Sequence, residues 1–364
     1  MQITKARFSQ FRNIDFCDLS LSGKNHFMLG VNGQGKSNCL EAIGFISALR
    51  SFRTQLTKPL FQKNTNEFQL FYEIEHERLG ITEVELHIKP KQKILLIDGD
   101  PVKRLADFIG LFPVVPLHSG DFMILRGSPS ERRRFFDMTL ASVDREYFQS
   151  LRMYHKAVQE RNQLLKMQSK GQALDAFEKE LAKCAYSLVV KRREGIEHIS
   201  QILVNVYEAF SEDKESPVLA YKPDMDCPSI SAYEHFFAEQ RKKDQIMGST
   251  GRGPHRDDYS ISLAIGGAKE YGSDGQQRGL IVALRMAQAS LFEMELGIKP
   301  VILVDDILGE LDPMRKKSFW ATCPKEIQII ASGTEYSVEE TSLDWQVWNV
   351  NNGKFTQSDS THQK

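Results

Sequence analysis

The sequence predicts an α/β fold in which a helical segment interrupts a domain built from strands and helices. Three observations support this prediction. A glycine-rich loop over residues 30–37 stands between a short apolar strand and an apolar helix. Residues 128–210 repeat apolar side chains at helical spacings of three, four or seven. After that stretch, an apolar strand over residues 301–304 ends in two aspartates. We therefore expect the chain before and after the helices to form one domain.

The opening part of the chain, residues 1–125, is predicted to be mixed β structure with one helix. Residues 2–8 alternate apolar and polar side chains, as a half-buried strand does. Residues 38–49 carry enough apolar side chains for a mostly buried helix. Further strands are predicted over residues 14–21, 26–29, 68–75, 81–89, 94–97 and 113–117.

The loop over residues 30–37 matches G-x-x-x-x-G-K-[ST], the pattern of a phosphate-binding loop. Its glycines let successive backbone N–H groups point into one concavity, and the following helix directs its positive end at an anion. Lys36 would reach the β- and γ-phosphates, and the Ser37 hydroxyl would ligate Mg²⁺. The residues predicted to bind a nucleoside triphosphate are Gly30, Val31, Asn32, Gly33, Gln34, Gly35, Lys36 and Ser37.

Residues 126–248 are predicted to form a helical arm. Ser128, Pro129 and Glu131 have the pattern of a helix start with a capping box, in which Ser128 is the N-cap. Two or three long helices are expected over residues 128–210, and a smaller one over residues 233–243. The basic runs 132–134 and 191–193 are candidates for phosphate contacts with DNA, or they form solvated helix faces.

Residues 249–364 are predicted to complete the nucleotide domain. Asp305 and Asp306 end an apolar strand in a Walker-B pattern, in which Asp305 would hold the Mg²⁺ shell and Asp306 would polarise the attacking water. Upstream, residues 273–277 contain a Ser-x-Gly-Gln pattern before an apolar helix. This order of motifs is that of ABC-type ATPases, where the Ser–Gly–Gln stretch contacts a γ-phosphate held by a second protomer. The alternative is an ordinary helix capped by Ser273.

Composition narrows the class of protein. Net charge is −1, from 47 basic and 48 acidic residues, so a nucleic-acid surface has to be a local patch. The five cysteines are scattered without a C-x-x-C pair, which argues against a zinc site or disulfide framework and fits a reducing cytosol. No apolar run approaches the roughly 20 residues that span a bilayer, and no signal peptide is evident. A cytoplasmic protein without membrane contact is expected.

At this point the motifs resemble those of the RecF family of bacterial DNA replication and repair ATPases, relatives of the SMC-type heads. The resemblance covers nearly the whole chain, and residues 253–258 are its most specific part. The other matching segments are residues 11–13, 30–37 with 40–43, 51–53, 127–129 with 132–133 and 136–137, 154–162, 275–278 with 283–284, 305–306 and 310–312.

The resemblance implies an ABC-type P-loop ATPase head, made of two sequence segments, with an inserted α-helical arm domain. It implies an ATP-driven homodimer with slow, DNA-stimulated hydrolysis, in which Ser273 and Gln276 of one protomer and Asp306 of the other act on one ATP. The implied partners are single-stranded or gapped DNA or duplex junctions, and the mediator proteins RecR and RecO. The implied role is replication-linked recombinational repair and support of the SOS response.

Several departures and alternatives stay open. Gly272 precedes Ser273, where the family usually has a small or apolar residue such as leucine. Residues 332–335 contain no switch histidine. The resemblance therefore does not imply a rate of ATP hydrolysis for this chain. Residues 118–121 replace the proline-acid pattern that is commoner in this family at that segment. The role of His255 is also open: it is either a catalytic base or a structural histidine. A soluble ATPase subunit of an ABC transporter and an ATP-binding clamp with little turnover are the alternative functions.

Overall fold

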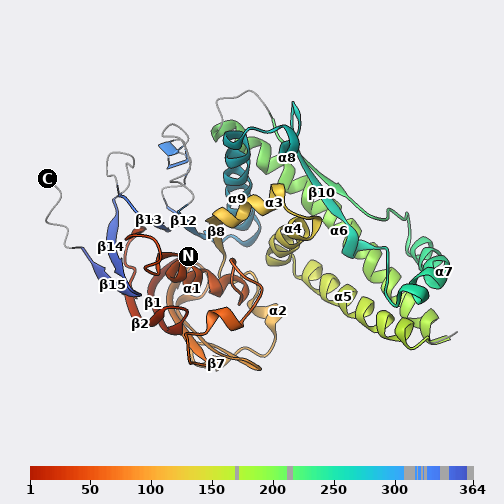
Figure 1. Cartoon of the computed structure of the whole chain (residues 1–364), viewed down its shortest axis with the longest axis horizontal. Helices are drawn as coiled ribbons and strands as arrows, with labels where there is room; N and C mark the ends of the chain where they lie inside the picture. The colour runs from red at the N-terminus through yellow and green to blue at the C-terminus, as the bar shows by residue number, and fades with distance from the viewer. Residues whose placement is uncertain are drawn as a thin grey trace. The chain divides into compact units, whose positions relative to one another are not determined.

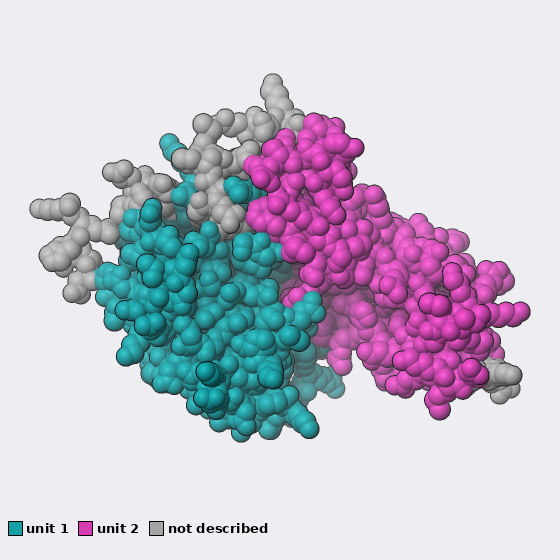
Figure 2. All heavy atoms as spheres, in the orientation of Figure 1, with its two compact units in different colours: residues 1–121, 208–213, 278–364 teal, residues 122–207, 214–277 magenta. Residues whose placement is uncertain are grey.

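In a computed structural model the chain forms two compact units (Figure 2). The first contains Met1–Asp121, Glu208–Asp213 and Arg278–Lys364, and the second contains Phe122–Tyr207 and Lys214–Gln277. The structure describes residues 1–168, 172–210, 216–306, 316, 317, 319, 320, 323, 326–336 and 344–358. The predicted motif at residues 310–312 lies outside them. Within the described residues, no helix is long and apolar enough to cross a membrane.

The first unit begins with a six-stranded antiparallel sheet in the order β2-β1-β4-β5-β6-β7, of which Figure 1 labels β1, β2 and β7. Its pairing shifts register between Ile3 and Lys5 of β1, so the buried positions run Ile3, Ala6 and Phe8 rather than every second residue. The strands are β1 Gln2–Phe11, β2 Ile14–Ser20, β4 Phe68–His76, β5 Gly80–Lys89, β6 Gln92–Ile97 and β7 Asp100–Pro101.

A second sheet in the first unit has the order β15-β14-β3-β13-β12-β8. All its pairings are parallel except that of β14 with β15. Because β8 precedes the helical segment and β12 follows it, strands from both parts of the chain pair in one sheet. The strands are β3 Asn25–Leu29, β8 Val114–His118, β12 Val301–Asp305, β13 Ile329–Gly333, β14 Gln346–Asn351 and β15 Lys354–Gln357.

Helix α1, Lys36–Ala48, packs against strands of both sheets: β1 of the first and β8, β12 and β13 of the second. It is therefore buried on most of its surface, which explains why its apolar residues do not follow a single stripe. A short helix α2, Leu105–Phe108, and two 3₁₀ turns, η1 Lys58–Leu60 and η2 Ser119–Asp121, complete this part of the unit.

The second unit is mainly helical. Helices α4 and α5 contact each other, α7 packs against α5, and α4 also contacts β10 of a small antiparallel sheet in the order β11-β10-β9. The elements are α3 Phe122–Arg126, α4 Pro129–Val143, α5 Arg145–Lys166, α6 Gln172–Phe210, β9 Val218–Lys222, α7 Ile230–Met247, η3 Pro254–Arg256, β10 Asp258–Leu263, β11 Gly266–Gly267 and α8 Ala268–Tyr271. Helix α9, Asp274–Leu296, begins in this unit and continues in the first.

Three details differ from the sequence-based expectations. Ser128 is the N-cap of α4, but its side chain makes no cap hydrogen bond and instead contacts Ser130, so the predicted capping box does not form. Strands β9 and β10 were not predicted. Because they pair with each other, residues 249–277 group with the helical unit, whereas the sequence-based division ended the arm at residue 248.

Candidate nucleotide site and signature helix

The glycine-rich loop joins β3 to α1, and its last residue has a backbone conformation that glycine accepts without strain. Gly35 precedes α1 with φ of 114°, and a Cβ at this position would lie 3.0 Å from the side-chain amide of Asn13. The N–H of Cys39 donates to the Gly35 carbonyl at 2.9 Å, which closes the first turn of α1. The loop thus ends at the N-terminus of a 13-residue helix, where negative charge is stabilised.

Lys36, the first residue of α1, holds its ammonium group against the loop. Its side chain is buried, and Nζ donates hydrogen bonds to the carbonyl oxygens of Gly30 and Val31, the latter at 3.2 Å. Burial lowers the pKa of Lys36, whereas the charges of Asp306 and Asp305 raise it. The ammonium therefore lies within electrostatic reach of both aspartates, at the place where the motif requires a cation for phosphate.

The two aspartates at the end of β12 have different surroundings. Asp305 is largely buried, and its Oδ1 accepts a hydrogen bond at 2.9 Å from the hydroxyl of Ser332, its partner in register on β13. Asp306 follows with φ of 56°, in the left-handed region, where the strand ends. Partial burial raises the pKa of Asp306, Lys36 lowers it, and Asp305 raises it. The structure thus brings Lys36, Asp305 and Asp306 together.

A buried carboxylate that the sequence analysis did not single out as a site residue ties three segments together behind the loop. Glu41 of α1 has no exposed surface, forms ion pairs with Arg12 and Arg53, and accepts a hydrogen bond from the hydroxyl of Ser51. Burying one charge is costly unless its partners are also in place. The segments 11–13 and 51–53 therefore hold α1, and a glutamate within an apolar helix pattern is the sequence signal that points to such a cluster.

A second chain of contacts reaches the loop through amide side chains. Asn38 of α1 accepts a hydrogen bond from Arg53 at 2.9 Å and donates one to Asn13 at 2.8 Å. Asn13 in turn donates to the backbone carbonyl of Gln34 at 3.3 Å. The side chain of Gln34 accepts from the N–H of Asn352 at 2.8 Å, beyond β14. Gln34 of the loop thus accepts hydrogen bonds from Asn13 and Asn352, two residues that are distant from it in the sequence.

The unusual segment at residues 118–121 has a structural explanation. His118, at the end of β8, accepts a hydrogen bond at Nδ1 from the N–H of Gly120 at 3.0 Å, and its Nε2 lies 3.2 Å from Asp121. Asp121 also pairs with Arg285 of α9 through two hydrogen bonds. Burial lowers the pKa of His118, so the ring is neutral and bridges β8 to the following turn.

The signature residues form a reciprocal cap at the start of α9. The hydroxyl of Ser273 accepts from the N–H of Gln276 at 3.2 Å, and the side chain of Gln276 accepts from the N–H of Ser273 at 2.8 Å. Capping uses an acceptor lone pair of the hydroxyl, so the Ser273 O–H can still donate to a phosphate. A Cβ on Gly272 would lie 2.6 Å from the Ala268 carbonyl oxygen, which explains why glycine replaces the usual larger residue.

His255, in the family-specific segment 253–258, has both ring nitrogens in hydrogen bonds. Nδ1 lies 2.7 Å from the hydroxyl of Tyr154, and Nε2 lies 3.0 Å from the backbone carbonyl of Thr250. Because a carbonyl only accepts, Nε2 carries the proton and Nδ1 accepts from Tyr154. Burial lowers the pKa of His255, so the ring stays neutral. These contacts favour the structural interpretation over a catalytic base.

Cations from both basic runs of the arm pair with carboxylates within the second unit. Arg132 makes two hydrogen bonds to Asp258, at 2.7 and 3.0 Å, and Lys191 pairs with Asp144 and Glu146. Arg192 is buried and bonds to Asp137, Asp257 and the carbonyl of Pro254. From the sequence these cations were candidates for DNA contacts or for a solvated helix face, but their pairing favours a structural role, in which Arg192 connects α6 to the segment 253–258.

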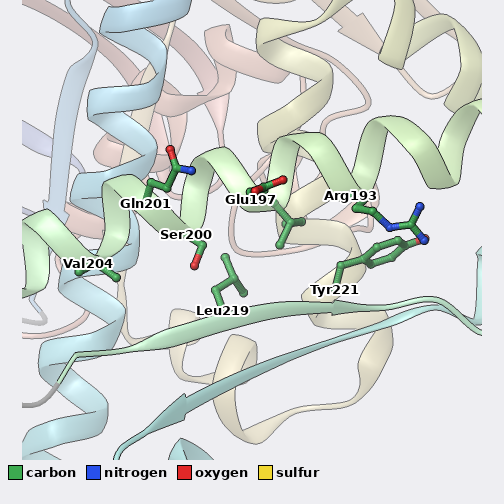
Figure 3. A pocket seen from close by; sticks show the side chains of 8 residues that line it. Arg193, Glu197, Ser200, Gln201, Val204, Leu219 and Tyr221 are labelled. Atoms are coloured by element: carbon green, nitrogen blue, oxygen red, sulfur yellow. The ribbon is translucent and has the colours of Figure 1, made fainter.

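The neighbouring arginine offers a contrast. Arg193 is 49% exposed, pairs with Asp226 at 2.7 Å, and lies at a groove of about 360 Å³ between α6 and β9, lined also by Glu197, Leu219 and Tyr221 (Figure 3).

Replacing Arg192 with alanine is expected to lower the free energy of unfolding by about 3–5 kcal/mol, because Asp137 and Asp257 lose their cation. Arg193→Ala should cost about 1 kcal/mol or less. Urea titration of both variants measures the difference, and equal stabilities would contradict the buried network.

The α/β head with its phosphate loop and the strand that ends in two aspartates, interrupted by a helical unit, is typical of the class of P-loop ATPases. No family model matches the chain. The chain is 31% identical over 363 residues to the DNA replication and repair protein RecF of Clostridium botulinum (strain 657 / Type Ba4), covering 98% of this chain and 99% of the relative. It is 32% identical over 344 residues to RecF of Geobacter metallireducens (strain ATCC 53774 / DSM 7210 / GS-15), covering 93% and 94%. The chain belongs to the RecF family.

Solved structures agree with this assignment. The recombination mediator protein RecF-ATPrS in the RecFOR pathway superposes with a TM-score of 0.89 and 25% identity, covering 98% of each chain. An SmcHead bound to the C-winged helix domain of ScpA has a TM-score of 0.57 and 15% identity, over 99% of this chain and 98% of that one, and shows similarity of fold alone. The predicted fold class is therefore confirmed, while the roles of the individual site residues stay predictions.

Proposed function

We propose that this protein binds ATP with residues 30–37 and couples its hydrolysis to DNA binding in replication-linked recombinational repair. The observation that carries this proposal is the placement of Lys36, buried against the loop carbonyls and within electrostatic reach of Asp305 and Asp306. That arrangement supplies one cation for the β- and γ-phosphates and two carboxylates beside it. The proposed process, replication-linked recombinational repair, is taken from the names of the relatives, which are a DNA replication and repair protein and a recombination mediator protein.

The donor groups at this site fit Mg²⁺. Mg²⁺ binds oxygen ligands, and it usually takes one or two from the protein and the rest from phosphate and water. The Ser37 hydroxyl at the start of α1 and the Asp305 carboxylate are the two oxygen donors we assign to it. Among the described residues, no group of three or more His, Cys, Asp or Glu side chains could hold a metal ion. Bound Mg²⁺ would neutralise charge that develops on the phosphates.

Three other residues of the chain have separate proposed roles in binding the phosphates and in hydrolysis. Lys36 offers its ammonium to the β- and γ-phosphates, and the N-terminus of α1 stabilises their charge. Asp306, whose pKa is raised by partial burial, accepts a hydrogen bond from the attacking water and orients it. Ser332 holds Asp305 through the hydroxyl hydrogen bond, so that the two aspartates keep separate roles.

We further propose that the active form is an ATP-dependent homodimer. Ser273 and Gln276 of one copy would contact the γ-phosphate held by residues 30–37 of the other copy. Both half-sites present backbone N–H groups and positive helix ends, which repel each other until an anion separates them. A triphosphate supplies the negative charge, so ATP should drive association and loss of the γ-phosphate should release it.

The proposed partners are single-stranded or gapped DNA or duplex junctions and the mediator proteins RecR and RecO, in the cytoplasm and in support of the SOS response. Gel-shift titrations on gapped, single-stranded and duplex DNA, with and without ATP, test the first of these. ATP-stimulated binding to DNA together with DNA-stimulated hydrolysis is expected. ATP binding without measurable turnover would favour the clamp alternative, and association with membrane fractions instead of DNA would favour a transporter subunit.

Substituting the two aspartates separately tests their assigned roles. Asp305→Asn is expected to abolish Mg²⁺-dependent hydrolysis, because a metal-ligating carboxylate is lost. Asp306→Asn is expected to keep ATP bound and to slow hydrolysis by about 100-fold, because only the water-orienting group changes. Equilibrium dialysis with ATP and steady-state hydrolysis measure the two effects. Asp18→Asn removes an acidic group paired with Lys5 and Arg7 on the surface and serves as a control. Normal hydrolysis by Asp306→Asn would assign the water to another residue.

A further inference from the structure

The start of α9 contains a negative charge that conflicts with the role proposed for it. Asp274 immediately follows Ser273, and its side chain is 74% exposed. A carboxylate in the first turn suits the helix dipole. However, a carboxylate beside Ser273 would also repel the γ-phosphate that the same helix end is proposed to contact. The half-site therefore needs a cation close to Asp274.

Arg126, the last residue of α3, supplies that cation. Its Nη2 donates to Oδ1 of Asp274 at 2.5 Å, and its Nε donates to Oε1 of Gln277 at 2.6 Å. The guanidinium also lies 5.1 Å from the ring centroid of Phe122, one turn back on the same helix, which limits its rotation. One arginine thus holds the first and the fourth residue of α9 at the same time.

The contact continues from Gln277 to the residue before the signature serine. Gln277 is 5% exposed, and its amide nitrogen donates to the Gly272 carbonyl at 2.8 Å and to the Lys269 carbonyl at 3.4 Å. Arg126 fixes the oxygen of this amide and thereby determines which way the amide faces. The backbone on the N-terminal side of Ser273 is therefore held through Gln277 by a residue from another helix.

We propose that Arg126 is a positioning residue of the signature half-site. Its guanidinium neutralises Asp274 and fixes Gln277, so that α9 presents Ser273 and Gln276 to the γ-phosphate bound by a second copy of the chain. Arg126 acts through Asp274 and Gln277 without touching the nucleotide. This inference rests on the shared site proposed above. The Arg126 guanidinium is the group that allows Asp274 to lie beside a phosphate bound at Ser273.

The test compares ATP-dependent dimerisation of Arg126→Gln, Asp274→Asn and the double variant by sedimentation with a non-hydrolysable ATP analogue. An unneutralised charge beside a phosphate is expected to weaken each half-site about tenfold, and a homodimer contains two, so Arg126→Gln should raise the dimer dissociation constant about 100-fold. ATP affinity of the monomer should not change, because residues 30–37 are untouched. Asp274→Asn alone should dimerise at least as well as the wild type.

Rescue and salt dependence separate the charge role from simple packing. The double variant Arg126→Gln/Asp274→Asn should regain most of the lost affinity, and the deficit of Arg126→Gln should shrink as added salt screens the repulsion. Arg193→Gln is the matched control, because Arg193 is 49% and Arg126 45% exposed and both pair with an exposed aspartate. Thermal unfolding of both variants should be alike.

The outcomes decide between the proposals. Arg126→Gln that dimerises like the wild type would overturn the inference, and so would a deficit that neither salt nor Asp274→Asn relieves. A wild type that stays monomeric with the analogue bound would overturn the shared site itself, and this inference with it. Dimerisation of the wild type and of Arg193→Gln, with a salt-sensitive loss in Arg126→Gln alone, supports both.

Discussion

Lys36→Ala is expected to reduce ATP hydrolysis by about 100-fold or more, because one preorganised charge at the transferring phosphate is removed. The structure gives a specific reason for the size of this effect. The ammonium is buried and bonded to the carbonyls of Gly30 and Val31, so the protein itself holds it against residues 30–37. Its loss also leaves Asp305 and Asp306 without their neighbouring cation, which adds repulsion toward a triphosphate.

Steady-state hydrolysis and equilibrium binding of ATP measure the effect of Lys36→Ala. Lys63→Ala, at an exposed position of the same unit, is the control and should behave as the wild type. Thermal unfolding establishes that both variants are folded. Wild-type affinity and turnover in Lys36→Ala would show that residues 30–37 do not hold the nucleotide.

Ser273→Arg is expected to bind ATP as a monomer and to lose both hydrolysis and ATP-stimulated DNA binding. A bulky side chain would replace the hydroxyl at the contact proposed for the γ-phosphate of the partner copy, while residues 30–37 remain intact. The variant also loses the serine cap, which costs about 1 kcal/mol of helix stability. Sedimentation with a non-hydrolysable ATP analogue distinguishes monomer from dimer, and a gel shift with ATP reports DNA binding.

A matched substitution separates capping from nucleotide contact. Ser229 caps α7 in the same unit, where its side chain accepts a hydrogen bond from the N–H of Ala232 at 3.2 Å. Ser229→Arg therefore loses the same kind of cap without changing α9, and it should still dimerise with ATP. Dimerisation by Ser273→Arg as well would contradict the proposed contact at the signature helix, whereas loss of dimerisation in both variants would point to helix stability alone.

Much of the fold could be predicted because its periodic patterns are local. Strands β1, β2, β4, β5 and β6 and helix α1 lie close to where apolar spacing placed them, and the bulge between Ile3 and Lys5 accounts for the first of two irregular intervals between buried residues in β1. Strands β9 and β10 were missed because each is short and is stabilised chiefly by pairing with the other across 35 intervening residues, from Lys222 to Asp258. Such pairing leaves little periodic signal in either segment.

The sequence by itself determined the phosphate loop, the Walker-B strand and their order, because a backbone that must curl around phosphate requires glycine, lysine and serine at set positions. Only the tertiary structure decided which charges are compensated. Arg192 meets Asp257 at a separation of 65 residues, and Arg126 meets Gln277 at a separation of 151. Whether an arginine binds phosphate or holds a helix depends on which carboxylates and carbonyls lie beside it in the folded chain. Residue type and local spacing do not contain that information.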